Sequence, residues 1–189
     1  MSKQDILDAA KSLLWRDGYA SMSPRKVMDA SGAGQGSLYH HFRSKAALAE
    51  AALDAIADEL IASAELLFTT DLPPMDLIGA YLTLERDGLK GCRLGRLANE
   101  TEVLGDPSLQ ARLHSYFVRI EALLSASLRA AQADGTLPAS LNVADTAALL
   151  AASVQGGFLL SRAKADREDV ARATRGAWAL LQASQSTKR

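Results

Sequence analysis

Apolar residues recur at helical spacing along almost the whole chain. Near the N-terminus, Ile6, Leu7, Ala10, Leu13 and Leu14 fall on one stripe of a helix. No run alternates apolar and polar residues over six positions, and β-branched residues are sparse, so the pattern favours helices over strands. We expect an all-α protein with about nine helices.

Capping residues and glycines mark where these helices begin and end. Ser23-Pro24 is a start signal, because serine can accept hydrogen bonds from free amides and proline is tolerated at the first helical position. Gly18 and Gly32 are stop signals. The predicted helices span residues 3–17, 24–31, 35–42, 45–68, 75–88, 94–104, 107–133, 143–165 and 167–185.

The segment 144–160 is apolar on nearly every side of its helix and contains Gly156-Gly157. Such a helix is expected to be buried all round, and the glycines predict close approach of another helix. It is either the core helix of a monomer or part of a dimer interface. The uncharged stretch from Thr146 to Ser161 is shorter than the roughly 20 residues that span a bilayer. With no signal-peptide pattern at the N-terminus, we expect a cytoplasmic protein without a membrane segment.

Composition narrows the function classes. The 189 residues are 48% hydrophobic and 23% charged, with a net charge of −1, which is typical of a globular protein and not of a generic nucleic-acid coat. Residues 1–50 hold seven basic and five acidic side chains. A single cysteine, Cys92, excludes an internal disulfide framework. Three histidines without a nucleophile, phosphate-loop or zinc-protease motif predict no enzyme, metal or cofactor.

Two short helices separated by a glycine turn fit a helix-turn-helix unit. The residues Gly32-Ala33-Gly34-Gln35-Gly36-Ser37-Leu38-Tyr39-His40-His41-Phe42, followed by Ser44-Lys45-Ala46-Ala47-Leu48, resemble the DNA-binding domain of the TetR family in order and spacing. The resemblance implies a helix-turn-helix domain over 1–46 and a helical effector-binding and dimerisation domain over 47–189. It also implies a homodimeric repressor of a palindromic operator, released by a small-molecule effector. The alternative is a helical interaction module that binds no DNA.

Side chains at the start of a helix in the major groove face base edges and phosphates. In the family, matching positions contact DNA, whereas Leu38 and Phe42 would be core. Gly34 departs from the family by standing where a capping serine or threonine is common, which weakens the third helix by about 0.5–1 kcal/mol. The candidate DNA-binding residues are Ser23, Arg25, Lys26, Gln35, Gly36, Ser37, Tyr39, His40 and Lys45.

One short recognition helix reads too few base pairs, so a two-fold dimer is expected. The apolar helix 143–165 and the last helix are the natural dimer surface, although packing inside one chain is the alternative. The candidate interface residues are Val154, Gly157, Ala173, Ala177, Trp178, Leu180 and Leu181.

Two effector mechanisms stay open. One is a small apolar or aromatic molecule, with Asn99, Glu100 and Gln155 as polar contacts and a wall formed by Phe68, Tyr81, Leu82, Tyr116, Phe117, Ile120 and Phe158. The other is a redox or electrophile switch at Cys92, whose thiolate Lys90, Arg93 and Arg96 would stabilise. The segment from Gly91 to Glu100 resembles the NemR-like, electrophile-responsive subgroup of the family. Cys92 is otherwise a small buried apolar residue.

Overall fold

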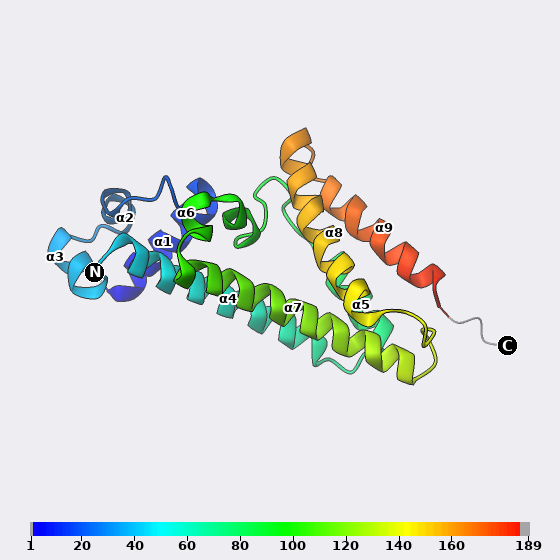
Figure 1. The fold of residues 1–189 in the computed structure, drawn as a ribbon. Helices are drawn as coiled ribbons and strands as arrows, with labels where there is room; N and C mark the ends of the chain where they lie inside the picture. The colour runs from blue at the N-terminus through cyan, green and yellow to red at the C-terminus, as the bar shows by residue number, and fades with distance from the viewer. Residues whose placement is uncertain (1, 186–189) are drawn as a thin grey trace. The chain divides into compact units, whose positions relative to one another are not determined.

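The computed structural model describes residues 2–185, and this part of the chain is helical with no strand (Figure 1). The all-α prediction is therefore confirmed. The elements are α1 (Lys3–Asp17), α2 (Pro24–Ser31), α3 (Gln35–His41), α4 (Lys45–Phe68), α5 (Pro74–Thr83), the 3-10 helix η1 (Gly95–Asn99), α6 (Thr101–Leu104), α7 (Pro107–Ala133), α8 (Val143–Lys164) and α9 (Asp169–Ala183).

The chain forms two compact units. Unit 1 contains the residues up to Leu60 together with Cys92–Tyr116, and unit 2 contains Ile61–Gly91 and the residues from Phe117 onward. Helices α4 and α7 each contribute residues to both units. The expected domain boundary between residues 46 and 47 remains a prediction.

The first two helices begin and end where the caps predict. Ser2 caps α1: its hydroxyl oxygen accepts the Asp5 amide at 3.2 Å, and the Asp5 carboxylate accepts the Ser2 amide at 2.7 Å. This reciprocal pair satisfies two amides that lack partners inside the helix. Gly18 ends α1 with φ of 85°, in the region that favours glycine. The Ser23 hydroxyl caps α2 with a single hydrogen bond from the Lys26 amide, and Gly32 ends the helix.

Two predicted helices are shorter in the structure. The predicted helix 75–88 ends at Thr83, because the Arg86 guanidinium donates to the carbonyls of Tyr81, Leu82 and Leu84, where the amides of another helical turn would donate. The predicted helix 94–104 is divided into η1 and α6 at Glu100, whose backbone is extended.

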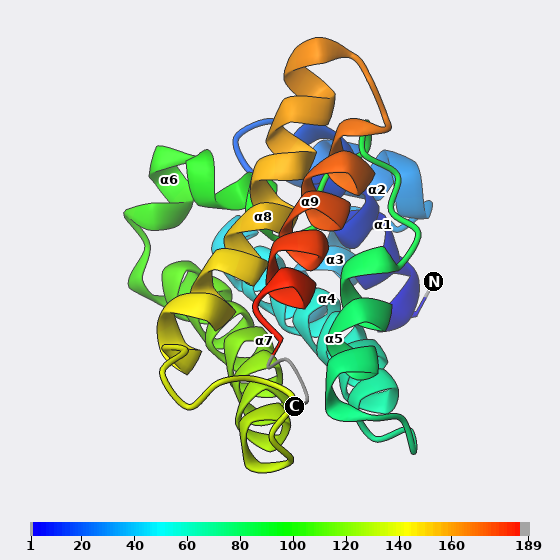
Figure 2. The same ribbon diagram turned by 90° about the vertical axis from the view of Figure 1, so that its right-hand side faces the viewer.

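In unit 2, α8 and α9 pack side by side (Figure 1), and α5 packs against α9 (Figure 2). A Cβ atom on Gly157 would lie 2.7 Å from the Val170 Cα, and one on Gly79 would lie 2.8 Å from the Trp178 ring. Gly157 therefore allows the close helix approach expected of the glycine pair. The approaching helix is α9 of the same chain. A Cβ on Gly156 would meet no atom within 4 Å.

The expectation that α8 is buried all round is wrong for a single chain. Leu149 is 58% exposed and Leu159 65% exposed. By length and composition alone, α8 could cross a bilayer, a property that it shares with the core helices of soluble proteins.

Candidate nucleic-acid interface

A small apolar core positions α3 in unit 1. Leu38 is 2% exposed and Phe42 5%, as expected of core residues, and Val27 of α2 and Ile6 of α1 are fully buried. Leu38 of α3 and Phe42, which directly follows the helix, both pack into this core, so the opposite face of α3 is directed outward. The fold thus presents the remaining side chains of α3 to solvent.

None of the nine candidate DNA-binding residues is buried in the core. The exposed ones are Arg25, Lys26, Gln35, Gly36, Tyr39 and His40, and the half-buried ones are Ser23, Ser37 and Lys45. The Ser23 hydroxyl accepts the Lys26 amide at 3.3 Å as the cap of α2. These residues come from the N-cap and first turn of α2, from α3 and from the first residue of α4.

The start of α3 is unobstructed. Its N-cap residue, Gly34, has no side chain to bond the first amides, so the helix lacks the cap that serine or threonine would supply. A Cβ on Gly34 or on Gly36 would meet no atom within 4 Å. The backbone at Gly36 can therefore approach another molecule closely.

The first turn of α4 lies against the turn between α1 and α2. The Lys45 ammonium donates to the carbonyl of Ala20 at 3.4 Å and stands 4.2 Å from the centroid of the Tyr19 ring. The Ser44 hydroxyl accepts the Ala47 amide at 3.0 Å and caps the helix. A lysine beside the amides of a helix N-terminus is an arrangement suited to a phosphate group. Burial raises the pKa of the Tyr19 phenol, which is therefore neutral at physiological pH.

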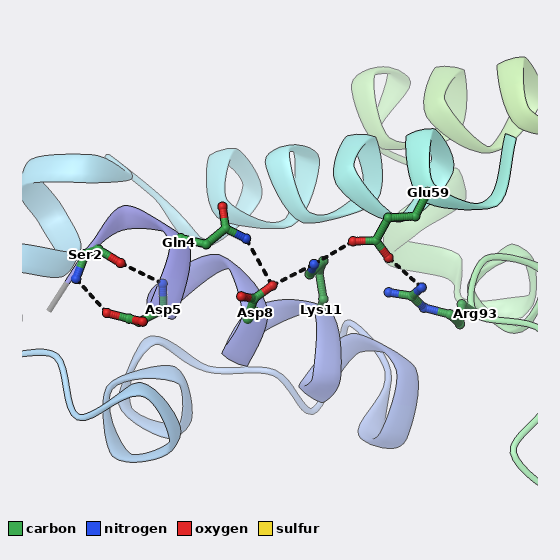
Figure 3. Close-up of polar contacts among 7 residues, drawn as sticks. All are labelled: Ser2, Gln4, Asp5, Asp8, Lys11, Glu59 and Arg93. Atoms are coloured by element: carbon green, nitrogen blue, oxygen red, sulfur yellow. Dashed lines mark hydrogen bonds and ion pairs between the residues drawn. The ribbon is translucent and has the colours of Figure 1, made fainter. Parts of the chain in front are cut away.

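A chain of polar contacts joins α1, α4 and the segment before η1 (Figure 3). The Gln4 amide donates to Asp8, and Lys11 bridges Asp8 at 2.6 Å and Glu59 of α4 at 2.7 Å. Arg93 donates to the other oxygen of Glu59 at 2.7 Å. The hydrogen bonds from Lys11 and Arg93 lower the pKa of Glu59. The ion pair between Lys11 and Glu59 therefore fixes α1 against α4.

Two expected effector contacts in unit 1 have other partners. The Arg96 guanidinium donates to the carbonyls of Trp15 and Arg16 at the end of α1, and the Glu100 carboxylate accepts the amides of Tyr19 and Ala20. Neither pairing is visible in the sequence, because 80 or 81 residues separate the partners.

The other expected effector residues of unit 1 differ in exposure. Cys92 is buried, and its sulfur accepts the Gly95 amide at 3.2 Å. Tyr116 is buried as well, whereas Asn99 is exposed.

In unit 2 the structure brings two expected effector residues together. The rings of Phe68 and Tyr81 lie 5.7 Å apart, and the Arg86 guanidinium lies 5.1 Å from the Tyr81 ring. Phe117, Gln155 and Phe158 are half-buried. A recess of about 410 Å³ in this unit is lined by Leu82–Asp87 and by Arg167, Glu168, Val170, Ala171, Thr174 and Arg175. Among these lining residues only Leu82 was expected from the sequence, because the recess forms where α5 stops at Thr83.

The expected dimer residues lie largely inside the chain. Val154 and Leu181 are 3% and 4% exposed, and Gly157 packs on Val170. Ala173, Ala177 and Trp178 are half-buried. The outward residues of these two helices are Leu149, Leu159, Leu160 and Leu180, which are 58%, 65%, 43% and 71% exposed. Leu180 was expected at the interface from the sequence. The three leucines of α8 were missed because α8 is apolar on both faces, so its periodicity does not distinguish inside from outside.

An outward polar face on a short helix, packed on an apolar core after a glycine turn, is typical of a helix-turn-helix DNA-binding domain. The chain belongs to the TetR family: residues 6–52 match the model of bacterial regulatory proteins of the tetR family, and residues 75–177 match the tetracyclin repressor-like C-terminal domain. It is a transcriptional regulator, and the resemblance seen in the sequence is confirmed.

Individual relatives agree with this assignment. The HTH-type transcriptional regulator UidR of Escherichia coli K12 is 27% identical over 171 residues, which cover 88% of this chain and 83% of that protein. The HTH-type transcriptional repressor KstR2 of Rhodococcus jostii is 28% identical over 102 residues, covering 47% of this chain and 50% of that protein.

Solved structures show the same fold. A TetR-family regulator from Agrobacterium tumefaciens superimposes with a TM-score of 0.85 at 26% identity, covering 94% of this chain and 96% of that one. The reduced form of Escherichia coli NemR gives 0.83 at 23% identity, covering 97% of each chain.

Proposed function

We propose that the protein is a homodimeric, one-component repressor that acts in the cytoplasm. Each subunit places α3 in the major groove of a palindromic operator, and a small-molecule effector releases the complex. The observation that carries this proposal is the division of α3 into a buried face, Leu38, and an exposed polar face, Gln35, Tyr39 and His40.

The residues around α3 divide into two roles. Gln35 and Ser37, at the start of α3, are positioned to contact base edges, while Gly36 lets the backbone approach. Tyr39 and Lys45 contact phosphates and fix the orientation of the helix. Arg25, Lys26, Ser23 and His40 extend the same surface. The relative KstR2 is named a repressor, which supports repression as the mode of action.

The outward leucines of α8 and α9 support dimerisation. Leu149, Leu159 and Leu160 on α8 and Leu180 on α9 are large apolar side chains exposed on one chain, which a second copy can cover. A dimer also meets the requirement of the DNA, because two recognition helices read two half-sites of a palindrome. Trp178 and Ala177 lie on the neighbouring turn of α9.

Release follows from thermodynamic coupling. If effector binding favours a spacing of the two α3 helices that does not fit the operator, effector and DNA weaken each other's binding by the same factor. The second candidate mechanism is modification of Cys92, favoured by the backbone amide of Gly95 that donates to its sulfur.

The test measures, by fluorescence anisotropy, how tightly the protein binds a DNA duplex selected from a random library. Light scattering measures the oligomeric state of the protein. The wild type is expected to bind as a dimer with strong salt dependence. Leu159→Glu with Leu180→Glu is expected to give a folded monomer with binding weakened at least about a hundredfold, because one subunit reads only a half-site. A helical interaction module would select no duplex, and that result would overturn the proposal.

The two release mechanisms are separated by a thiol alkylator. If alkylation releases the wild type but not Cys92→Ser from the selected duplex, the cysteine switch is supported. If both stay bound, Cys92 is structural, and the effector acts without covalent modification.

A further inference from the structure

We propose that Glu100 is a positioning residue for DNA binding: its carboxylate fixes the Tyr19-Ala20 turn, and that turn holds Lys45 where it meets a phosphate. The inference rests on the proposed function, in which Lys45 contacts the DNA backbone. All four residues belong to unit 1.

Both carboxylate oxygens of Glu100 accept hydrogen bonds from the turn. One carboxylate oxygen accepts the Tyr19 amide at 3.0 Å, and the other accepts the Ala20 amide at 2.8 Å. Hydrogen bonds to a charged acceptor are stronger than neutral ones. A Cβ on Gly18 would lie 2.5 Å from the first of these oxygens, so the glycine leaves room for the carboxylate as well as allowing the positive φ.

Lys45 is bound to the same two residues. Its ammonium donates to the Ala20 carbonyl at 3.4 Å and stands over the Tyr19 ring at 4.2 Å. The turn therefore has Glu100 on its amides and Lys45 on its carbonyl and ring. A displacement of the turn removes both supports of the lysine at once.

Arg96 binds the backbone that precedes Gly18. Its guanidinium donates to the carbonyls of Trp15 and Arg16, the latter at 2.9 Å, where α1 ends. A cation on the carbonyl end of a helix and an anion on the amides that follow both match the local backbone charge. The segment 96–100 thus fixes the end of α1 and the turn together.

The local backbone supports this assignment. Glu100 has φ of −96° and ψ of 118°, an extended conformation that separates η1 from α6. Continuing the helix through this residue would add backbone hydrogen bonds, yet the chain departs from it where the side chain reaches Tyr19 and Ala20.

The experiment compares Glu100→Ala, Glu100→Gln and Lys45→Ala with the wild type on the selected duplex over a range of salt concentrations. Glu102→Gln is the matched control, because Glu102 is an exposed carboxylate on the adjoining α6. Glu100→Ala and Lys45→Ala are each expected to weaken binding about tenfold and to reduce the salt slope by about one per subunit. Glu100→Gln, which retains one carbonyl oxygen, should fall between Glu100→Ala and the wild type.

The double variant Glu100→Ala/Lys45→Ala should bind no more weakly than Lys45→Ala alone, because both changes remove the same contact. A loss of folded protein would lower the active fraction without changing the salt slope, so the slope separates positioning from unfolding. Thermal unfolding of each variant, with Glu100→Gln as the milder change, checks this directly.

The outcomes distinguish the two proposals. If the wild type shows no salt-sensitive DNA binding, the proposed function is wrong. If Lys45→Ala binds like the wild type, the proposed contact between Lys45 and a phosphate is wrong. If Lys45→Ala weakens binding while Glu100→Ala matches Glu102→Gln, or if the two losses are additive, the positioning role of Glu100 is overturned.

Discussion

Helices α3 and α8 each have one face toward their own unit and one toward solvent, and their outward faces differ in kind. The outward face of α3 is polar, with Gln35, Tyr39 and His40, whereas that of α8 is apolar, with Leu149 and Leu159. The inward faces of both helices are apolar. The difference separates two kinds of partner: a polar face suits the charged groove of DNA, and an apolar face suits a second copy of the chain.

The largest effect is expected from the two faces of α3. Leu38→Ala should lower the free energy of unfolding by about 2–5 kcal/mol, because the side chain is fully enclosed and its removal leaves a cavity. Tyr39→Ala should change it by less than about 0.5 kcal/mol, since the ring is 44% exposed, yet it should abolish operator binding.

Urea unfolding and anisotropy on the selected duplex measure the two quantities separately. If Tyr39→Ala lost as much stability as Leu38→Ala, Tyr39 would be a structural residue and the outward face of α3 would not be a free DNA surface.

A smaller effect is expected from the two glycines of α8. Gly157→Ala should destabilise the fold by about 1–3 kcal/mol, because the added methyl group overlaps the backbone of Val170 on α9. Gly156→Ala should be neutral or stabilise by up to about 1 kcal/mol, since alanine favours helix and its Cβ meets open space.

Both glycine variants are best measured by urea unfolding in the Leu159→Glu/Leu180→Glu background, where a partner copy does not contribute. Equal losses for the two changes would mean that α8 is packed closely on both faces within one chain.

The sequence predicts α3 better than α8 for a physical reason. Caps, glycine stops and the spacing of Leu38 and Phe42 act within a few residues, so they fix the ends of α1, α2 and α4 and the orientation of α3. Where both faces of a helix are apolar, the hydrophobic pattern does not show which face packs inside the chain. For this reason Val154 and Leu181 were expected at an interface, whereas they are buried within one chain.

Specific side-chain contacts account for the remaining differences. The end of α5 depends on Arg86, which donates to carbonyls two to five residues before it. The break between η1 and α6 coincides with the contacts of Glu100 to Tyr19 and Ala20, 80 or 81 residues away. Helical pattern alone does not reveal such pairs.

The smallest effect on stability is expected from the polar contacts that join helices within each unit. Unit 1 joins α1 to α4 through the charged contacts of Lys11 with Glu59, and Arg93 binds the same carboxylate. Helices α8 and α9 pack closely at Gly157, and their polar contacts lie near the turn that connects them: Lys164 pairs with Asp169 at 3.2 Å, and the Ser161 hydroxyl accepts the Val170 amide at 3.0 Å. Because the pKa of Glu59 is lowered below its ordinary value near 4.5, the folded state favours the charged carboxylate. Its contribution to stability is therefore present above that value and is lost as the pH falls through the lowered pKa.

Glu59→Gln should accordingly reduce stability at pH 7 by no more than about 1 kcal/mol, since the side chain is partly exposed and the pairs are screened by solvent. The difference from the wild type should shrink as the pH falls below 4.5. Urea midpoints at a series of pH values measure this, with Glu102→Gln as the control. A difference that stayed constant down to pH 3 would show that Glu59→Gln and the wild type differ in packing and not in charge, and the ion pairs of Glu59 would then not be what stabilises unit 1.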